Sequence, residues 1–229
     1  MSQPLNLHRH DLLQLTTAGY DHAITAIEPY QQAPYLPSPI QLFPQALPPI
    51  VRAQIDTPSG LVAIGFASHM RQTDGVRLRG ATFVPATEIL ARTTPFQIAD
   101  QLNTYPHLKL KPALKELLML AQAHGLVAGF FGSCALALVT GKPYLHPTSD
   151  IDVLLKVSAD SSDLAGFYHC TQTLSQATGI PFDIEILCQN HQGAGIKLAE
   201  VMSPQTTVMA KSLYGPQVLR KQDIVWLEH

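Results

Sequence analysis

Two periods of hydrophobic and polar residues alternate in the second half of the chain, and they predict an α/β (α+β) architecture. Apolar residues at helical spacing predict helices over four ranges, 112–123, 134–140, 163–178 and 195–202. Short apolar runs predict strands over four other ranges, 126–131, 150–157, 182–188 and 206–211. Glycines, which commonly end helices in a left-handed conformation, follow the first three helices at Gly125, Gly141 and Gly179. The expected fold is a mixed sheet flanked by helices.

The first half of the chain has a different pattern, which predicts a smaller, strand-rich N-terminal domain. Seven prolines lie within residues 29–49, and because proline fixes φ and has no backbone donor, we expect an extended surface connector there. Two apolar segments, 50–55 and 60–67, flank a turn-rich break and predict a hairpin. A short helix is expected over residues 85–92, with Thr87 as its cap.

The change of pattern near residues 93–105 marks the expected boundary between two domains. Residues 1–95 would form the N-terminal domain with its proline-rich connector, and residues 96–226 would form the catalytic domain. The last three residues, 227–229, look like the stub of an expression tag and are not expected to have a role in function.

Composition and charge argue against several classes of protein. The formal net charge of −2 gives no general basic field, so nonspecific binding of nucleic acid is not expected. The three cysteines are widely spaced without a CxxC pair, which argues against a disulfide framework or zinc knuckle and favours a reducing, cytoplasmic location. No run of 18 apolar residues occurs and the N-terminus lacks an apolar signal core, so neither a membrane span nor secretion is expected.

A glycine-serine pair, Gly132 and Ser133, lies between an apolar strand and a helix. Glycine lets the backbone turn sharply and approach a ligand closely. The unpaired N–H groups at the start of the following helix suit a phosphate. Ordinary strand-to-helix turns often contain the same pair, so this motif indicates a phosphate site only together with the motifs that follow it.

Two aspartates follow on the next expected strand. Asp150 and Asp152 are two residues apart, so their side chains point to the same side of the strand, while Ile151 faces the core. Like charges on one face repel each other unless a cation lies between them. Mg²⁺, which prefers hard oxygen ligands, is the expected cation, and Mn²⁺ is possible. The alternative is a solvated strand start that binds nothing.

A second acidic strand repeats this geometry about thirty residues later. Asp183 and Glu185 share one face of the expected strand 182–188. If the two acidic strands are neighbours, three or four carboxylates converge, as metal-dependent phosphoryl transfer requires. The three motifs together therefore predict a metal-phosphate site, with Asp183 as the third ligand and Glu185 as the alternative.

The order of these motifs resembles that of the nucleotidyltransferase superfamily. The spacing from Ser133 to Asp150, with sixteen residues between them, is longer than in the compact members and indicates one branch. The segment FGSCALALVTGKPYLHPTSDIDVLL is similar to the phosphoribosyl-dephospho-CoA transferases of malonate decarboxylase, which are holo-acyl-carrier-protein synthases. Segments elsewhere fit the same family, namely RHDLLQL, PPIVRAQ, VAIGF, PFDIEI, GAGIKLAE and VMAKSLYGPQVL. The resemblance spans nearly the whole chain and is strongest over residues 132–155.

The resemblance implies a nucleotidyltransferase-like fold and a transfer reaction. The donor would be 2′-(5″-triphosphoribosyl)-3′-dephospho-CoA, and the acceptor a serine of the acyl-carrier subunit of malonate decarboxylase. The serine hydroxyl would attack the α-phosphorus and pyrophosphate would leave, attaching a phosphopantetheine-containing prosthetic group. In this family the two aspartates of the DxD motif are the catalytic pair, which corresponds to Asp150 and Asp152 here.

Several supporting residues have two interpretations. Gly132 and Ser133 are expected to bind donor phosphate, although Ser133 can also cap the helix. Lys211 is expected to neutralise a donor phosphate or to be a solvated strand end. His146 either approaches the acceptor hydroxyl or lies in a surface loop, and Cys134 is expected to be a small buried residue rather than a nucleophile.

Two rival functions remain from the sequence. One is a generic nucleotidyltransferase that uses a nucleoside triphosphate on a small molecule or a protein. The other is a noncatalytic module that binds a carrier protein without a metal. Three retained aspartates favour an enzyme over the binding module.

Overall fold

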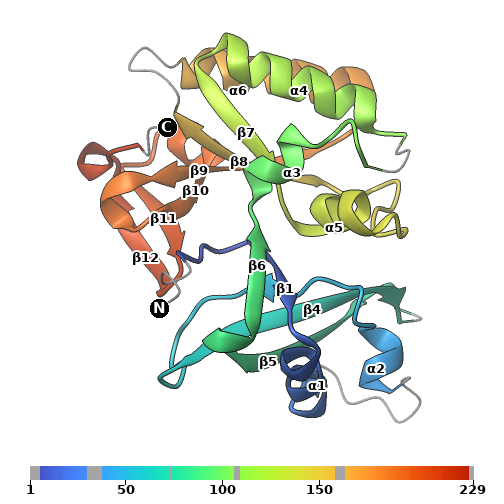
Figure 1. Cartoon of the computed structure of the whole chain (residues 1–229). Helices are drawn as coiled ribbons and strands as arrows, with labels where there is room; N and C mark the ends of the chain where they lie inside the picture. Colours follow the sequence, from blue (N-terminus) through green and yellow to red (C-terminus); the bar gives the residue numbers. More distant parts are fainter. Residues whose placement is uncertain (1–5, 30–37, 73, 106–108, 158–162, 227–229) are drawn as a thin grey trace. The chain divides into compact units, whose positions relative to one another are not determined.

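The computed structural model describes residues 6–29, 38–72, 74–105, 109–157 and 163–226 (Figure 1). The chain divides into two compact units, Met1–Thr94 and Pro95–His229. Residues 227–229, the expected tag remnant, lie outside the described residues. Both helices and sheets are present, as expected for an α/β protein. No helix in the described ranges is long and apolar enough to cross a membrane.

The first unit is built on an antiparallel sheet of six strands, in the order β2-β5-β4-β3-β1-β6. Its strands are β1 (Leu12–Leu15), β2 (Glu28–Pro29), β3 (Ile50–Val51), β4 (Leu61–Arg71), β5 (Arg77–Pro85) and β6 (Ile89–Thr93). Its helices are α1 (Thr17–Thr25), α2 (Pro39–Leu42) and a 3-10 turn, Ala86–Glu88. The core contains the fully buried side chains of Ile64, Phe66 and Val84.

The expected hairpin in this unit is present in part. Ile50 pairs with Gly65, and β3 runs antiparallel to β4, but only two residues of the segment 50–55 form a strand. The expected helix over residues 85–92 is wrong. A 3-10 turn is followed there by β6, which pairs with β1. Pairing with a strand more than seventy residues away outweighs the weak local preference of so short a segment.

The expectation of an extended surface connector over residues 29–49 is met only in part: residues 38–41 and 44–46 are exposed, but the segment contains a helix and buried side chains. Residues 30–37 lie outside the described residues. Helix α2 follows, beginning at Pro39, because proline is tolerated in the first turn of a helix. Leu42, Phe43 and Leu47 are buried, and their burial ties this segment to the core.

The second unit is built on a mixed sheet of six strands, in the order β12-β11-β10-β9-β8-β7. Its strands are β7 (Leu126–Phe130), β8 (Ile151–Val157), β9 (Phe182–Cys188), β10 (Ala194–Lys197), β11 (Thr207–Ser212) and β12 (Gly215–Arg220). Its helices are α3 (Pro95–Asp100), α4 (Lys111–Ala123), α5 (Gly132–Thr140), α6 (Leu164–Thr178), α7 (Leu198–Met202) and two 3-10 turns, Gln189–His191 and Lys221–Asp223. Strands β8 and β9 are parallel and the other pairs are antiparallel.

The structure confirms most of the expected elements of this unit. The expected helices over 112–123, 134–140 and 163–178 correspond to α4, α5 and α6. The expected helix over 195–202 is wrong in its first half, where β10 inserts between β9 and β11 before α7 begins. Helices α4 and α6 pack together on one side of β7 and β8, while α5 lies on the other side (Figure 1).

Candidate metal centre

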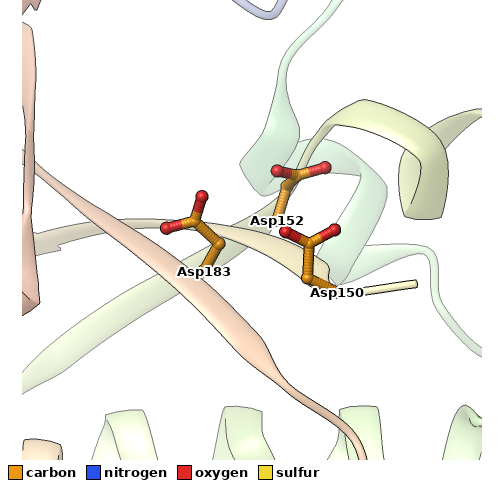
Figure 2. Close-up of side chains that lie close together, drawn as sticks. All are labelled: Asp150, Asp152 and Asp183. Carbon is orange, nitrogen blue, oxygen red and sulfur yellow. The ribbon is translucent and has the colours of Figure 1, made fainter. Parts of the chain in front are cut away.

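Three aspartates converge where β8 and β9 begin. Asp150 directly precedes β8, Asp152 lies within it, and Asp183 lies on β9. One carboxylate oxygen from each of the three lies within 4.8 Å of the other two. Figure 2 shows the three side chains on the same side of the two strands. The expected convergence of acidic side chains from two neighbouring strands is therefore present.

The strand register explains this convergence. Asp152 is the register partner of Asp183 in the parallel pair of strands. Alternate residues point to opposite faces of a sheet, so the intervening side chains turn the other way. Those side chains, Ile151, Val153 and Ile184, are buried and hold the strands against the core. An acidic residue at every second position thus places the carboxylates on one accessible face.

The glycine-serine corner contacts this cluster. Gly132 has a φ of +60°, and a Cβ added there would lie 2.0 Å from Oδ2 of Asp152, so only glycine fits. The backbone N–H of Ser133 donates a hydrogen bond to the carboxylate of Asp152. Helix α5 begins at this corner, so the positive end of its dipole faces the aspartates.

The electrostatics of Asp152 favour a positive charge beside its carboxylate. Its pKa is raised to about 7 by burial, and then by the negative charges of Asp150, Asp183 and Glu185. The hydrogen bond from Ser133 acts in the opposite direction but does not compensate for these effects. Half-buried carboxylates that repel one another are stabilised by a divalent cation between them. Three closely spaced carboxylate oxygens fit Mg²⁺ or Mn²⁺ in the kind of ligand atom they offer.

Two lysines lie beside the acidic residues on the next strands of the sheet. Nζ of Lys197, the last residue of β10, lies 2.9 Å from Oδ2 of Asp183. Nζ of Lys211, on β11, lies 3.6 Å from Oε1 of the buried Glu185. Lys211 was expected near a phosphate from the sequence, whereas Lys197 was not singled out. The short strand β10 had been expected to be helical, which hid the face that Lys197 shares with the aspartates.

Glu185, the alternative third ligand, lies apart from the cluster. It is 5% exposed, and its carboxylate covers Gly195, where an added Cβ would lie 2.4 Å from Oε2. Its ion pair with Lys211 directs it towards β11. With all groups ionised, these four carboxylates and two ammonium groups leave a surplus of two negative charges, which one divalent cation would neutralise.

The other candidate residues lie outside this group. Cys134 is fully buried, and burial followed by the charge of Asp152 raises the pKa of its thiol, so it is not a nucleophile. His146 is exposed in a tight turn, where Oγ of Ser149 accepts a hydrogen bond from its backbone N–H. No contact in the described structure links His146 to the aspartates.

The comparisons with known proteins agree on one protein family. The family model described as phosphoribosyl-dephospho-CoA transferase MdcG C-terminal domain matches residues 97–222, which contain the aspartates, the glycine-serine corner and both lysines. A phosphoribosyl-dephospho-CoA transferase of Pseudomonas syringae pv. tomato is 28% identical over 177 residues, which are 75% of this chain and 77% of that protein. One of Pseudomonas putida is 25% identical over 193 residues, covering 75% and 78% of the two chains.

Another relative has a higher sequence identity over a shorter aligned region. A phosphoribosyl-dephospho-CoA transferase of Xanthomonas axonopodis pv. citri is 38% identical over 68 residues, covering 30% of this chain and 32% of that protein. No solved structure matches the chain. Because the family model covers more than half of the sequence, the chain belongs to the phosphoribosyl-dephospho-CoA transferase family.

Proposed function

We propose that this protein transfers the 2′-(5″-phosphoribosyl)-3′-dephospho-CoA group from its triphosphate donor to a serine of the acyl-carrier subunit of malonate decarboxylase. The names of the relatives support a transferase that acts on a CoA-derived group. In the reaction, the serine oxygen forms a bond to the α-phosphorus of the donor. The bond from that phosphorus to the bridging oxygen breaks, pyrophosphate leaves and the hydroxyl proton is released.

The aspartate cluster carries this proposal. Asp150, Asp152 and Asp183 would hold Mg²⁺ through their convergent carboxylate oxygens. When bound, the ion would supply positive charge for the triphosphate and bring the hydroxyl and the phosphorus together. Such a reaction needs positioning and charge stabilisation, and little covalent chemistry from the protein. A nucleotidyltransferase-type mechanism would use carboxylates placed in this way to hold its metal ion.

The remaining residues of the site would position the donor. Gly132 lets the chain lie against Asp152, and Ser133 directs its N–H at the same carboxylate, which fixes the orientation of that side chain. The other N–H groups at the start of α5 would face an anion that approaches the cluster. Lys211 would add a positive charge two strands away from Asp183.

Mass spectrometry of the apo carrier subunit tests the proposal directly. The subunit is incubated with the protein, the triphosphoribosyl-dephospho-CoA donor and Mg²⁺. A mass gain equal to the phosphoribosyl-dephospho-CoA group is expected, together with release of pyrophosphate. An unchanged mass with active donor and carrier would contradict the proposal.

Two controls separate the rival functions. ATP alone in place of the donor should leave the carrier unmodified, whereas a generic nucleotidyltransferase would add a nucleotide. The variant Asp152→Ala should bind the carrier as the wild type does but should not modify it. If the wild type and the variant behave alike in Mg²⁺ titrations, the protein acts as a binding module without a metal.

A further inference from the structure

Lys197 lies next to the carboxylate cluster. It is the last residue of β10, and its register partner on β9 is Glu185. Its ammonium group contacts Asp183, which is itself one of the three converging aspartates. The lysine side chain is 40% exposed and that of Asp183 is 31% exposed, so both groups are accessible to a ligand.

Oδ2 of Asp183 accepts a hydrogen bond from the ammonium group of Lys197. The ammonium group has three donors, and Asp183 is its only hydrogen-bond partner among the described residues. Further donors therefore remain to contact a ligand that is held at the aspartates.

Lys197 and Lys211 form a basic border on one side of the cluster. Both side chains lie on the same face of the sheet as Asp183 and Glu185, because each pairs with one of these carboxylates. On the other side, Gly132 and Ser133 present the start of α5 to Asp152. An anion at the carboxylates would thus meet positive groups from β10, β11 and α5, which lie on two sides of the cluster.

We propose that Lys197 binds the polyphosphate of the substrate, and that its ion pair with Asp183 holds its ammonium group in place before the substrate arrives. Asp183 would then pair with Lys197 in the free protein and bind the cation in the metal-bound protein. The lysine transfers its hydrogen bonds to phosphate oxygens when the cation occupies the carboxylates. Lys211 lies one strand further from the aspartates, so its contribution is smaller. This inference rests on the proposed function only for the choice of a triphosphate as ligand.

The test uses two simple probes on the full-length protein, inorganic tripolyphosphate with Mg²⁺ and Mn²⁺ alone. Calorimetry measures the first and electron paramagnetic resonance measures the second. Lys197→Gln should weaken tripolyphosphate binding by about tenfold or more, the loss expected for a charge-assisted contact. The same change should leave Mn²⁺ binding intact or make it tighter, because the lysine no longer competes for Asp183.

Two matched variants make the result specific. Lys115→Gln removes an exposed positive charge from α4, which packs against α6 and β7 and not against the cluster, and should behave as the wild type. Lys197→Met keeps the aliphatic stem without the charge and should repeat the effect of Lys197→Gln. If tripolyphosphate binding is equally strong in Lys197→Gln and Lys115→Gln, the proposal is wrong. Loss of Mn²⁺ binding in both Lys197 variants would show that the lysine only supports the fold, and would also overturn it.

The two proposals can fail separately. The probes contain neither the carrier protein nor the CoA moiety, so a failure of group transfer leaves the result at Lys197 unaffected. Equally, an enzyme that modifies the carrier while Lys197→Gln binds tripolyphosphate normally would retain the proposed function and lose this inference.

Discussion

Gly132 lies directly against the carboxylate of Asp152, and a Cβ at this position would overlap that carboxylate. We predict that Gly132→Ala impairs the site as well as the fold. The alanine Cβ would displace Asp152, and groups that orient metal ligands typically change metal affinity by about 10–100-fold. Mn²⁺ binding, measured by electron paramagnetic resonance, should therefore weaken by at least about tenfold.

Gly179→Ala is the matched control for this prediction. Gly179 has a φ of +69°, close to that of Gly132, but nothing lies within 4 Å of its added Cβ. It should lose only the stability associated with a left-handed backbone, about 1–2 kcal/mol, and should bind Mn²⁺ normally. If both variants bind Mn²⁺ as the wild type does, Gly132 has no role in orienting Asp152.

Removal of the charge of Asp152 should remove most of the stabilisation of the protein by Mg²⁺. In the wild type, Mg²⁺ at 100 times its Kd should stabilise the fold by about 2.7 kcal/mol, because the ion binds the native state alone. Asp152→Asn should lose most of this gain. Without Mg²⁺ at pH 8, the variant should be at least as stable as the wild type, because a repelled, half-buried negative charge has been removed.

Thermal unfolding with and without Mg²⁺ measures both effects. Asp223→Asn is the control, since Asp223 is exposed and pairs only with Arg220 among the described residues. Equal stabilisation of Asp152→Asn and the wild type by Mg²⁺ would show that the cation binds elsewhere.

The extent to which the sequence predicted this site differs from one strand to the next. The alternation of Asp150, Ile151 and Asp152 predicted which face the carboxylates share, because the period of a strand is a local property. The sequence did not predict that β8 and β9 are neighbours, because strand pairing joins residues that are far apart in the chain. Lys197 was missed for this reason: β10 is four residues long, and only its neighbours β9 and β11 make it a strand.

The same reason explains the errors in the first unit. The segment 85–92 was expected to be a helix from its local signals, but Ile89 is buried where β6 pairs with β1. Helix α2 was hidden by the prolines around it, although a proline in the first turn is compatible with a helix. In both cases burial against a distant strand or core decided the outcome, and no window of sequence contains that information.

The raised pKa of Asp152 predicts opposite pH dependences for the free and the metal-bound protein. A group whose folded pKa exceeds its unfolded value of 3.8 stabilises the fold fully below that value. This contribution is lost as pH rises through the folded pKa of about 7, so the metal-free protein should become less stable over that window. Mg²⁺ requires the ionised carboxylate, so its affinity should rise over the same window and then level off.

Unfolding curves between pH 5.5 and 8.5, recorded with and without Mg²⁺, check this prediction. Competition with one proton changes the apparent Kd by up to about tenfold per pH unit below 7. In Asp152→Asn the pH dependence should become much flatter. A wild-type Mg²⁺ affinity that does not vary with pH would show that Asp152 is ionised throughout.

Asp183 and Glu185 compete for the role of third carboxylate, and their surroundings predict different results on substitution. Asp183 lies within the cluster, while Glu185 is buried and paired with Lys211. Asp183→Asn should therefore weaken Mn²⁺ binding by about tenfold or more. Glu185→Gln should retain that binding and lose about 1 kcal/mol of stability, a modest amount because Lys211 is 41% exposed.

Mn²⁺ titration and urea unfolding of the two variants separate these roles, because each substitution removes one charge and keeps the size of the side chain. If Glu185→Gln abolishes Mn²⁺ binding while Asp183→Asn retains it, Glu185 is the third ligand. In that case its carboxylate must leave Lys211 when the cation binds, since the two are paired in this structure. Loss of binding in both variants would instead assign four carboxylates to the site, a number that suits two cations better than one.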